Sequence, residues 1–149
     1  MSVVEREDAS HWTRQAVRAV TAWAFQNEGE LPEDASAYKH RAITYMNTHA
    51  AFETNGFVDM VLNEADPERR ELFEVSLNDA LAQKGVAGQQ FSPKPGSLPT
   101  NTKRNKRVTI EGVTVEWEGD PSAAGISFES IEDGRQRIVI DTTGFKQKS

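Results

Sequence analysis

The chain of 149 residues contains no cysteine, which excludes disulfides, thiolate metal sites and cysteine nucleophiles together. It has no apolar run near the roughly 20 residues that a bilayer-spanning helix needs. Residues 1–8 also lack the apolar core of a signal peptide. Hydrophobic residues still make up 37% of the chain, which argues against global disorder. These observations predict a soluble, cytoplasmic globular protein.

Signatures of known chemistry are missing as well. No glycine-rich phosphate loop, dinucleotide fingerprint or nucleophile elbow occurs. The three histidines, His11, His40 and His49, are scattered, so a zinc site would form only if the fold gathered them. One group of acids surrounds an expected helix start, where the helix dipole and solvent explain it better than catalysis does. Its members are Glu64, Asp66, Glu68, Glu71 and Glu74. We therefore expect no enzyme activity, no metal and no cofactor.

Apolar residues recur at helical spacing over residues 8–85 and predict four helices. The first helix should begin near Asp8 or Ser10, either of which could cap its exposed amides, and should end around residues 27–29. Aromatic side chains follow the helical spacing, which favours core packing over an exposed docking surface or a homodimer interface. They are Trp12, Trp23, Tyr38 and Tyr45.

The next three helices differ in how clearly their ends are marked. Residues 31–34 predict a second start, with a proline suited to a first turn and acids suited to the helix dipole. Residues 54–56 predict a break before a short third helix. Residues 66–68, Asp-Pro-Glu, are the clearest start in the chain, and Lys84 with Gly85 marks the end of the fourth helix.

Residues 86–105 are rich in glycine, proline and polar side chains and predict a mobile linker or long loop, which Phe91 and Leu98 could pin. Beyond it apolar and polar residues alternate, which predicts a β-sheet part over residues 106–143. The expected strands cover about residues 107–111, 113–118, 125–131 and 135–142, with a bend or tight turn at Glu111-Gly112 and a hairpin at Asp133-Gly134.

The sequence therefore predicts a single α+β domain, with an N-terminal layer of about four helices followed by a small antiparallel sheet of three to four strands. A sheet of this size has one apolar face and needs a helical cover. The helix expected over residues 67–84 is the favoured cover. The residues expected on the apolar face are Val108, Ile110, Val113, Val115, Trp117, Ile126, Phe128, Ile138 and Ile140.

Charge is unevenly distributed along the chain, whose net charge is −6. Residues 1–92 carry 8 basic and 15 acidic side chains, whereas residues 93–149 carry 9 and 8. Any contact with phosphate should therefore use the second part of the chain. The candidate contacts there are Lys103, Arg104, Lys106, Arg107, Arg135 and Arg137, with Lys146 and Lys148 beyond them.

These cations predict a contact with double-stranded DNA that has little sequence preference, because phosphate oxygens carry no base identity. Asn101, Thr102 and Asn105 add neutral donors of the kind that contact phosphates. The alternative is that residues 103–107 keep an aggregation-prone strand soluble. The DNA hypothesis requires positive potential that is not neutralised. Carboxylates folded over the cations would favour protein docking instead.

The order of these segments resembles the C-terminal part of the NdpA-type bacterial nucleoid-associated proteins. The matching segments are residues 13–17, 29–32 and 56–61, the acidic helix, the strand pair at 108–110 and 113–117, and the closing residues 137–143. The resemblance implies a non-enzymatic, nucleoid-associated module that binds double-stranded DNA and contacts DNA-processing proteins. Family members are longer and have an N-terminal region that this chain lacks, so it would correspond to an isolated C-terminal domain or a shortened relative.

Two other functions stay open. The acidic helical part could pair with a basic partner surface, which would make the chain a protein–protein interaction module that regulates a DNA-processing enzyme. An enzyme with an unfamiliar site would need a deep pocket that joins His40 or His49 to several carboxylates.

Overall fold

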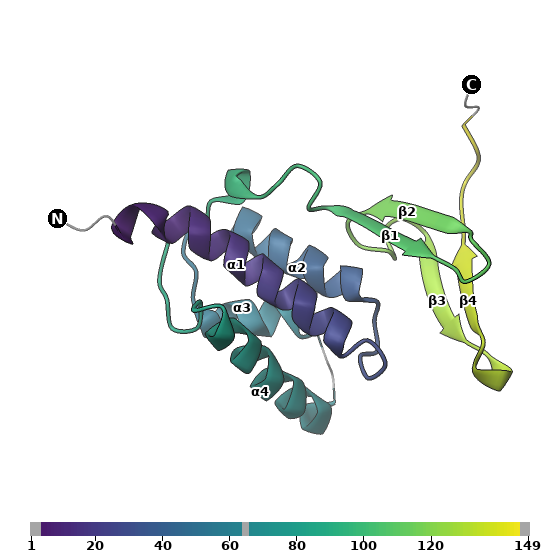
Figure 1. Cartoon of the computed structure of the whole chain (residues 1–149), viewed down its shortest axis with the longest axis horizontal. Helices are drawn as coiled ribbons and strands as arrows, with labels where there is room; N and C mark the ends of the chain where they lie inside the picture. Colours follow the sequence, from purple (N-terminus) through teal and green to yellow (C-terminus); the bar gives the residue numbers. More distant parts are fainter. Residues whose placement is uncertain (1–3, 64–65, 147–149) are drawn as a thin grey trace. The chain divides into compact units, whose positions relative to one another are not determined.

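The structure, a computed structural model, describes residues 4–63 and 66–146. The acid Glu64 and the cation Lys148 lie outside the described residues. Within the described ranges, four α-helices are followed by four antiparallel strands (Figure 1). This order confirms the predicted α+β class.

The chain divides after Thr102 into two compact units, which we call the helical unit and the hairpin unit. The helices are α1 (Val4–Gln26), α2 (Ala35–Thr48), α3 (Thr54–Val61) and α4 (Pro67–Gln83). None of the helices in the described part of the chain combines the length and the apolar character that a membrane-spanning segment needs.

The first helix is longer than predicted. It begins at Val4, not near Asp8 or Ser10. Residues 4–10 contain neither glycine nor proline, so nothing in the backbone forces the helix to start at the expected caps. Its last residue, Gln26, agrees with the predicted stop.

Two aspartates cap the starts of α2 and α4. The Oδ2 atom of Asp34 accepts a hydrogen bond of 3.0 Å from the Ser36 N–H, and the Oδ1 atom of Asp66 accepts one of 3.1 Å from the Glu68 N–H. Such caps typically contribute about 1 kcal/mol. Both predicted starts are confirmed, although α2 begins after the acids of residues 31–34 and not among them.

The third helix includes the residues that were expected to interrupt the chain. Residues 54–56 form the first turn of α3, because the Phe57 N–H donates to the Glu53 carbonyl across that turn at 2.9 Å. The glycine at position 56 is tolerated there because the turn lies at the helix end, where propensity matters least.

The core of the helical unit forms around Trp23, which is 2% exposed. Its indole contacts the rings of Tyr38 and Phe73 edge-on, with centroids 5.6 and 6.2 Å away, and its Nε1 donates to the Ser76 Oγ at 2.8 Å. Tyr45 is buried as well. Core packing is thus confirmed for Trp23, Tyr38 and Tyr45, whereas Trp12 is only partly buried against this core. Burying a large apolar side chain contributes roughly 1.5–3 kcal/mol.

The apolar stripe of α4 belongs to this same core. Phe73, Leu77 and Leu81 are buried among residues of α1, α2 and α3. The buried stripe predicted for this helix is therefore confirmed and packs within the helical unit, whereas its predicted role as a cover for the strands stays a prediction.

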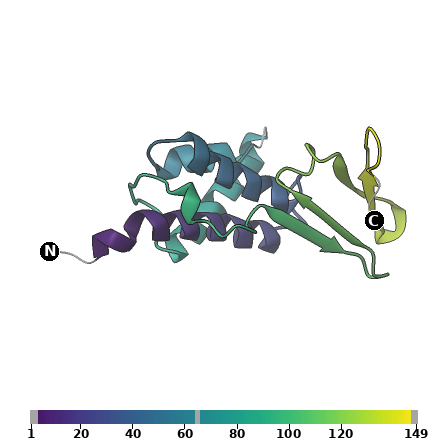
Figure 2. The ribbon, with the colours of Figure 1, turned by 90° about the horizontal axis from the view of Figure 1, so that it is seen from above.

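The segment that joins the two units is anchored on the helical unit. The ring of Phe91 stacks on that of Phe52 at 4.6 Å, and the Phe52 N–H donates to the Phe91 carbonyl at 2.8 Å. Farther along, the Lys94 N–H donates to the Thr13 Oγ1 at 3.0 Å, and Leu98 packs against the core. The two predicted anchors are confirmed, and the segment passes beside the first part of α1 (Figures 1 and 2).

The strands of the hairpin unit form two antiparallel pairs and not one continuous sheet. One pair is β1 (Arg104–Val108) with β2 (Thr114–Glu118), and the other is β3 (Ile126–Ser130) with β4 (Gln136–Ile140). The predicted turns close both hairpins, with positive φ angles at Gly112, Asp133 and Gly134. Between the hairpins, glycines with positive φ at positions 119 and 125 turn the chain, which separates β3 from β2.

The hairpin unit has a small core of its own. Trp117 and Ile126 are 7% and 6% exposed, and the Trp117 ring lies 5.7 Å from that of Phe128. Only part of the apolar set predicted from the alternation is therefore buried, because two-stranded sheets offer little area for packing.

Gly125 should be the position in the hairpin unit least able to accept a side chain. A Cβ at Gly125 would lie 2.2 Å from the Asp141 carbonyl oxygen, and its φ is +80°. We expect Gly125→Ala to destabilise the unit by more than about 2 kcal/mol, because a backbone clash adds to the usual cost of positive φ. Amide hydrogen exchange in β3 and β4 measures this loss.

Gly112→Ala is the matched control. Gly112 also has positive φ, +99°, but a Cβ there meets nothing within 4 Å, so the expected loss is about 1–2 kcal/mol. Equal losses for the two variants would contradict the clash.

Candidate interaction surface of the hairpin unit

The six cations predicted from the sequence all lie in the hairpin unit. Arg104, Lys106 and Arg107 are residues of β1, and Lys103 directly precedes it. The other two belong to the second hairpin, with Arg137 in β4 and Arg135 just before it. The structure thus brings four of the cations together on or directly before β1 and places the other two on or directly before β4.

Alternation along β1 divides its cations between two faces. Arg104 and Lys106 are exposed on one face, whereas Arg107 and Asn105 are half-buried on the other. The guanidinium of Arg107 lies over the ring of Phe128, 6.0 Å from its centroid. The cations were expected to form one group at the entrance to a strand that starts near residue 107. Instead they lie within the strand, and the pleat separates them.

Each exposed cation of β1 lies opposite a carboxylate on β2. The register pairs Arg104 with Glu118 and Lys106 with Glu116, and the Arg104 Nε lies 3.9 Å from the Glu118 Oε2. Directly opposed residues of an antiparallel pair share a face of the sheet, where opposite charges attract. The exposed face of this hairpin is therefore a row of matched charges.

The second hairpin repeats the arrangement. Arg137 is paired with Glu129 in the register, with 3.5 Å between the Arg137 Nη1 and the Glu129 Oε2. Residues 103–149 together carry eight basic and eight acidic side chains. Each exposed pair contributes at most about 1 kcal/mol to stability. Matched charges a few ångströms apart nevertheless cancel most of the field that a polyanion would feel.

Two of the three neutral donors expected to assist phosphate binding, Thr102 and Asn105, are bonded within the chain, and the third, Asn101, is exposed. The Asn105 Nδ2 donates to the carbonyls of Lys103 and Gly119, both at 3.1 Å, and so ties the open end of the first hairpin together. The Thr102 Oγ1 donates to the Pro99 carbonyl at 2.7 Å. These two side chains stabilise local turns, because they donate to backbone carbonyls of the same chain that lie within hydrogen-bond distance.

Apolar side chains are exposed at the closed end of the first hairpin. Val108 and Val113 are each 59% exposed, and Ile110 is fully exposed. We call these three residues the hairpin tip. Sequence reasoning identified them through their alternation but placed them on a buried face. The alternation is real, but these three side chains are exposed.

The histidines and acidic side chains of the described residues do not gather into a metal site. No group of three or more His, Cys, Asp or Glu side chains there could hold a metal ion. The His49 ring stacks on Tyr45 at 3.9 Å, and the His11 ring lies 4.8 Å from that of Trp12. A pocket of the helical unit contains one carboxylate and no histidine. It is lined by Asn27, Glu30, Arg69, Leu72, Phe73 and Ser76.

No family model, curated protein or solved structure matches the chain. The resemblance to NdpA-type proteins therefore stays a prediction.

The carboxylates of β2 should limit the affinity of the hairpin unit for nucleic acid. We expect Glu116→Gln/Glu118→Gln to bind duplex DNA more tightly than the unaltered chain does, with a steeper decrease in affinity as salt rises, because Arg104 and Lys106 would lose their opposing charges. Fluorescence anisotropy over a salt series measures both quantities.

Glu111→Gln/Glu132→Gln changes the net charge equally and is the control. Both of its carboxylates are exposed, and neither is opposite a cation in the ladders. Equal effects from the two variants would mean that total charge, and not the cross-strand pairing, governs the interaction.

Proposed function

We propose that the chain is a non-enzymatic protein-interaction module, and that the hairpin tip is the part of the hairpin unit that docks on a partner protein. One observation carries this proposal. The exposed cations of β1 lie opposite carboxylates, while Val108, Ile110 and Val113 are exposed beside them. A surface built for phosphate would have the opposite properties, with unmatched cations and few exposed aliphatic side chains.

The energetics favour apolar docking at this tip. Burial of apolar surface contributes about 25 cal/mol per Å². The free energy gained by burying a few exposed aliphatic side chains is therefore larger than the free energy that exposed charge pairs contribute. The matched charges along β1 and β2 then act as a polar rim, which suits a partner groove that is apolar inside and carries charges of both signs at its border.

The cations keep a role in this proposal. Each hairpin strand pairs on one side only, and such edges invite uncontrolled pairing with other chains. Charged side chains such as Arg104 and Lys106 oppose that pairing. The strand is protected along its length, and docking is confined to the tip.

Double-stranded DNA is the other candidate ligand, in keeping with the resemblance to nucleoid-associated proteins. It would use Lys103, Arg104, Lys106, Arg107, Arg135 and Arg137. The same resemblance makes a DNA-processing enzyme the first partner protein to test, and a bacterial nucleoid the first location to examine.

Two variants of the hairpin distinguish these ligands. The tip variant is Val108→Ser/Ile110→Ser/Val113→Ser, and the cation variant is Lys103→Ala/Arg104→Ala/Lys106→Ala/Arg107→Ala. A photo-crosslinker at Glu111, in the turn beside the tip, captures what docks there in nuclease-treated bacterial extract. We expect one protein adduct whose yield decreases at least about tenfold in the tip variant and little in the cation variant.

A crosslinker at Ser122, an exposed residue between the two hairpins, should capture nothing comparable. Adducts that disappear with nuclease treatment, or duplex binding abolished by the cation variant and spared by the tip variant, would replace protein docking with DNA binding. Circular dichroism confirms that both variants keep their strands.

A further inference from the structure

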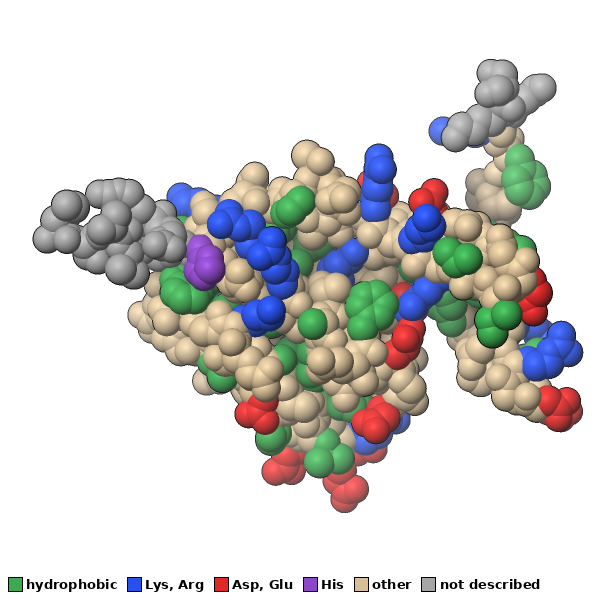
Figure 3. Space-filling view, viewed as in Figure 1, with side chains coloured by type: hydrophobic (Ala, Val, Ile, Leu, Met, Phe, Trp, Pro, Cys, Tyr) green, Lys and Arg blue, Asp and Glu red, His purple; other side chains and the backbone are tan. Residues whose placement is uncertain are grey.

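One side of the helical unit is built from two segments that contain no acidic residue. Residues 9–27, which include most of α1, and residues 86–98, which belong to the connecting segment, have no aspartate or glutamate. The two segments are held together, because the Lys94 N–H donates to the Thr13 Oγ1 at 3.0 Å. Figure 3 shows basic side chains and a histidine gathered over α1, and acidic side chains along α4.

Three cations of this side have no ion-pair partner among the described residues. Arg14 and Arg18 lie one helical turn apart on α1, where Arg14 is half-buried and Arg18 is exposed. Lys94 is exposed as well, and its backbone bond to Thr13 places it beside the turn that carries Arg14. We call Arg14, Arg18 and Lys94 the basic face. It differs from the hairpin unit, where each exposed cation of β1 lies opposite a carboxylate.

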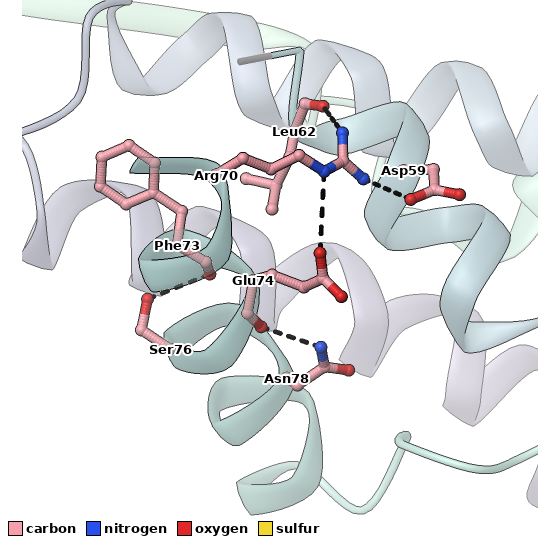
Figure 4. Close-up of polar contacts among 7 residues, drawn as sticks. All are labelled: Asp59, Leu62, Arg70, Phe73, Glu74, Ser76 and Asn78. Carbon is pink, nitrogen blue, oxygen red and sulfur yellow. Dashed lines mark hydrogen bonds and ion pairs between the residues drawn. The ribbon is translucent and has the colours of Figure 1, made fainter. Parts of the chain in front are cut away.

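Other arginines of the helical unit are already paired within the chain. Arg70 binds the Asp59 carboxylate and lies 3.7 Å from the Glu74 carboxylate (Figure 4). It also donates to the Leu62 carbonyl at 3.1 Å. Arg41 is likewise paired with a carboxylate, 2.7 Å away. The fold therefore uses these arginines as internal contacts and leaves those of the basic face available to a ligand.

Unpaired acids of the helical unit lie on a different helix from the basic face. Glu68, Glu71 and Asp79 of α4 have no ion-pair partner in the part of the chain that the structure describes. Unmatched charge of the two signs is thus separated between α1 and α4. Because local potential steers a charged ligand, an acidic ligand is attracted to α1 and repelled from α4.

We propose that the basic face binds an acidic helix of a partner protein, whose carboxylates are four residues apart and lie opposite Arg14 and Arg18. Four residues rise about 6 Å in any α-helix, so two glutamates at this spacing reach both guanidinium groups at once. Each guanidinium offers a planar pair of donors to a carboxylate, and Lys94 adds a contact at the flank. The basic face contains no residue of the hairpin tip, so this site is additional to the docking proposed there.

The size and surroundings of the basic face favour a short acidic segment over a nucleic acid or a membrane. Proteins that bind a duplex contact about 6–10 phosphates through a domain that is basic as a whole. The basic face has three cations, and residues 1–92 carry 8 basic and 15 acidic side chains. A helix that binds a membrane buries its apolar face in the lipid, but the apolar face of α1 is packed in the core.

Two synthetic peptides test the charge and the spacing together. Each is built from alanine and glutamine, has about 20 residues so that it can form a helix, and carries the same number of glutamates. In the first peptide the glutamates are four residues apart and share one face, whereas in the second they are five residues apart and do not. Fluorescence anisotropy near 0.1 M salt should show the first peptide bound at least about tenfold more tightly. Its binding should be lost near 1 M salt, where the Debye length is about 3 Å.

Charge reversal tests which residues make the contact. Arg14→Glu/Arg18→Glu should weaken binding of the first peptide at least about tenfold, and Lys94→Ala should weaken it less. A peptide with lysines in place of the glutamates should bind this double variant and not the unaltered chain, because the two signs are exchanged. Arg135→Glu/Lys146→Glu changes two exposed cations of the hairpin unit, alters the net charge equally, and should bind the first peptide like the unaltered chain.

Three results would overturn the proposal. Equal binding of the two glutamate peptides, or equal losses from the α1 variant and the hairpin variant, would mean that net charge and not the basic face governs the contact. Duplex DNA that binds more tightly than the first peptide, and is lost in the α1 variant, would replace the acidic helix with phosphate. The tip variant should bind the first peptide normally, so a failure of tip docking is distinguishable from a failure here. Circular dichroism of every variant shows that the helices are retained.

Discussion

The antiparallel register of β1 and β2 determines what the hairpin unit can offer to another molecule. It places Arg104 opposite Glu118 and Lys106 opposite Glu116. Because side chains alternate along a strand, a slip of one residue would move the cations and the carboxylates to opposite faces. The same residues would then form one positive face and one negative face. The turn at Gly112, which sets this register, therefore decides between a cationic surface and a neutral one.

The distribution of apolar side chains explains why several of them stay exposed in the hairpin unit. α4 packs Phe73, Leu77 and Leu81 into the helical core, and the connecting segment adds Phe91 and Leu98 to its edge. The strands are left with a core around Trp117 and Ile126. Two short hairpins cannot bury every apolar residue of an alternating pattern, so those at the tip stay exposed.

Features fixed by local chemistry could be predicted from the sequence. The starts of α2 and α4 depend on the side chains of Asp34 and Asp66, which bond to amides two residues away. The hairpin at Asp133 depends on two residues that tolerate positive φ. Both signals lie within a few residues, which is the range over which sequence patterns are reliable. The predicted start of α1 was wrong for a related reason, because a residue that can cap a helix does not force a helix to begin there.

Features that depend on distant segments could not be predicted in the same way. Alternation showed that Val108, Ile110 and Val113 share a pattern, but whether anything covers them depends on where α4 packs. The pairing of charges in the first hairpin depends both on local sequence and on the length of the loop between its strands. Counting outward from a two-residue turn at Glu111 and Gly112 pairs Lys106 with Trp117. The loop in the structure has three residues, 110–112, and pairs Lys106 with Glu116, so the matched charges depend on a loop length that the sequence did not fix. Considering the four cations without their opposing strand made the site look more positive than the fold allows.

The two units arrange their charges in opposite ways. The helical unit holds its unmatched cations on α1 and its unmatched acids on α4, so its fields extend to about a Debye length and weaken with salt. The hairpin unit pairs each exposed charge of β1 with its opposite, so the apolar tip remains as its main source of binding energy. Apolar association does not weaken with salt in the same way. Docking at the hairpin tip should therefore tolerate a rise in ionic strength that would weaken any contact made by the charges of the helical unit, because it depends on apolar surface that the fold leaves exposed.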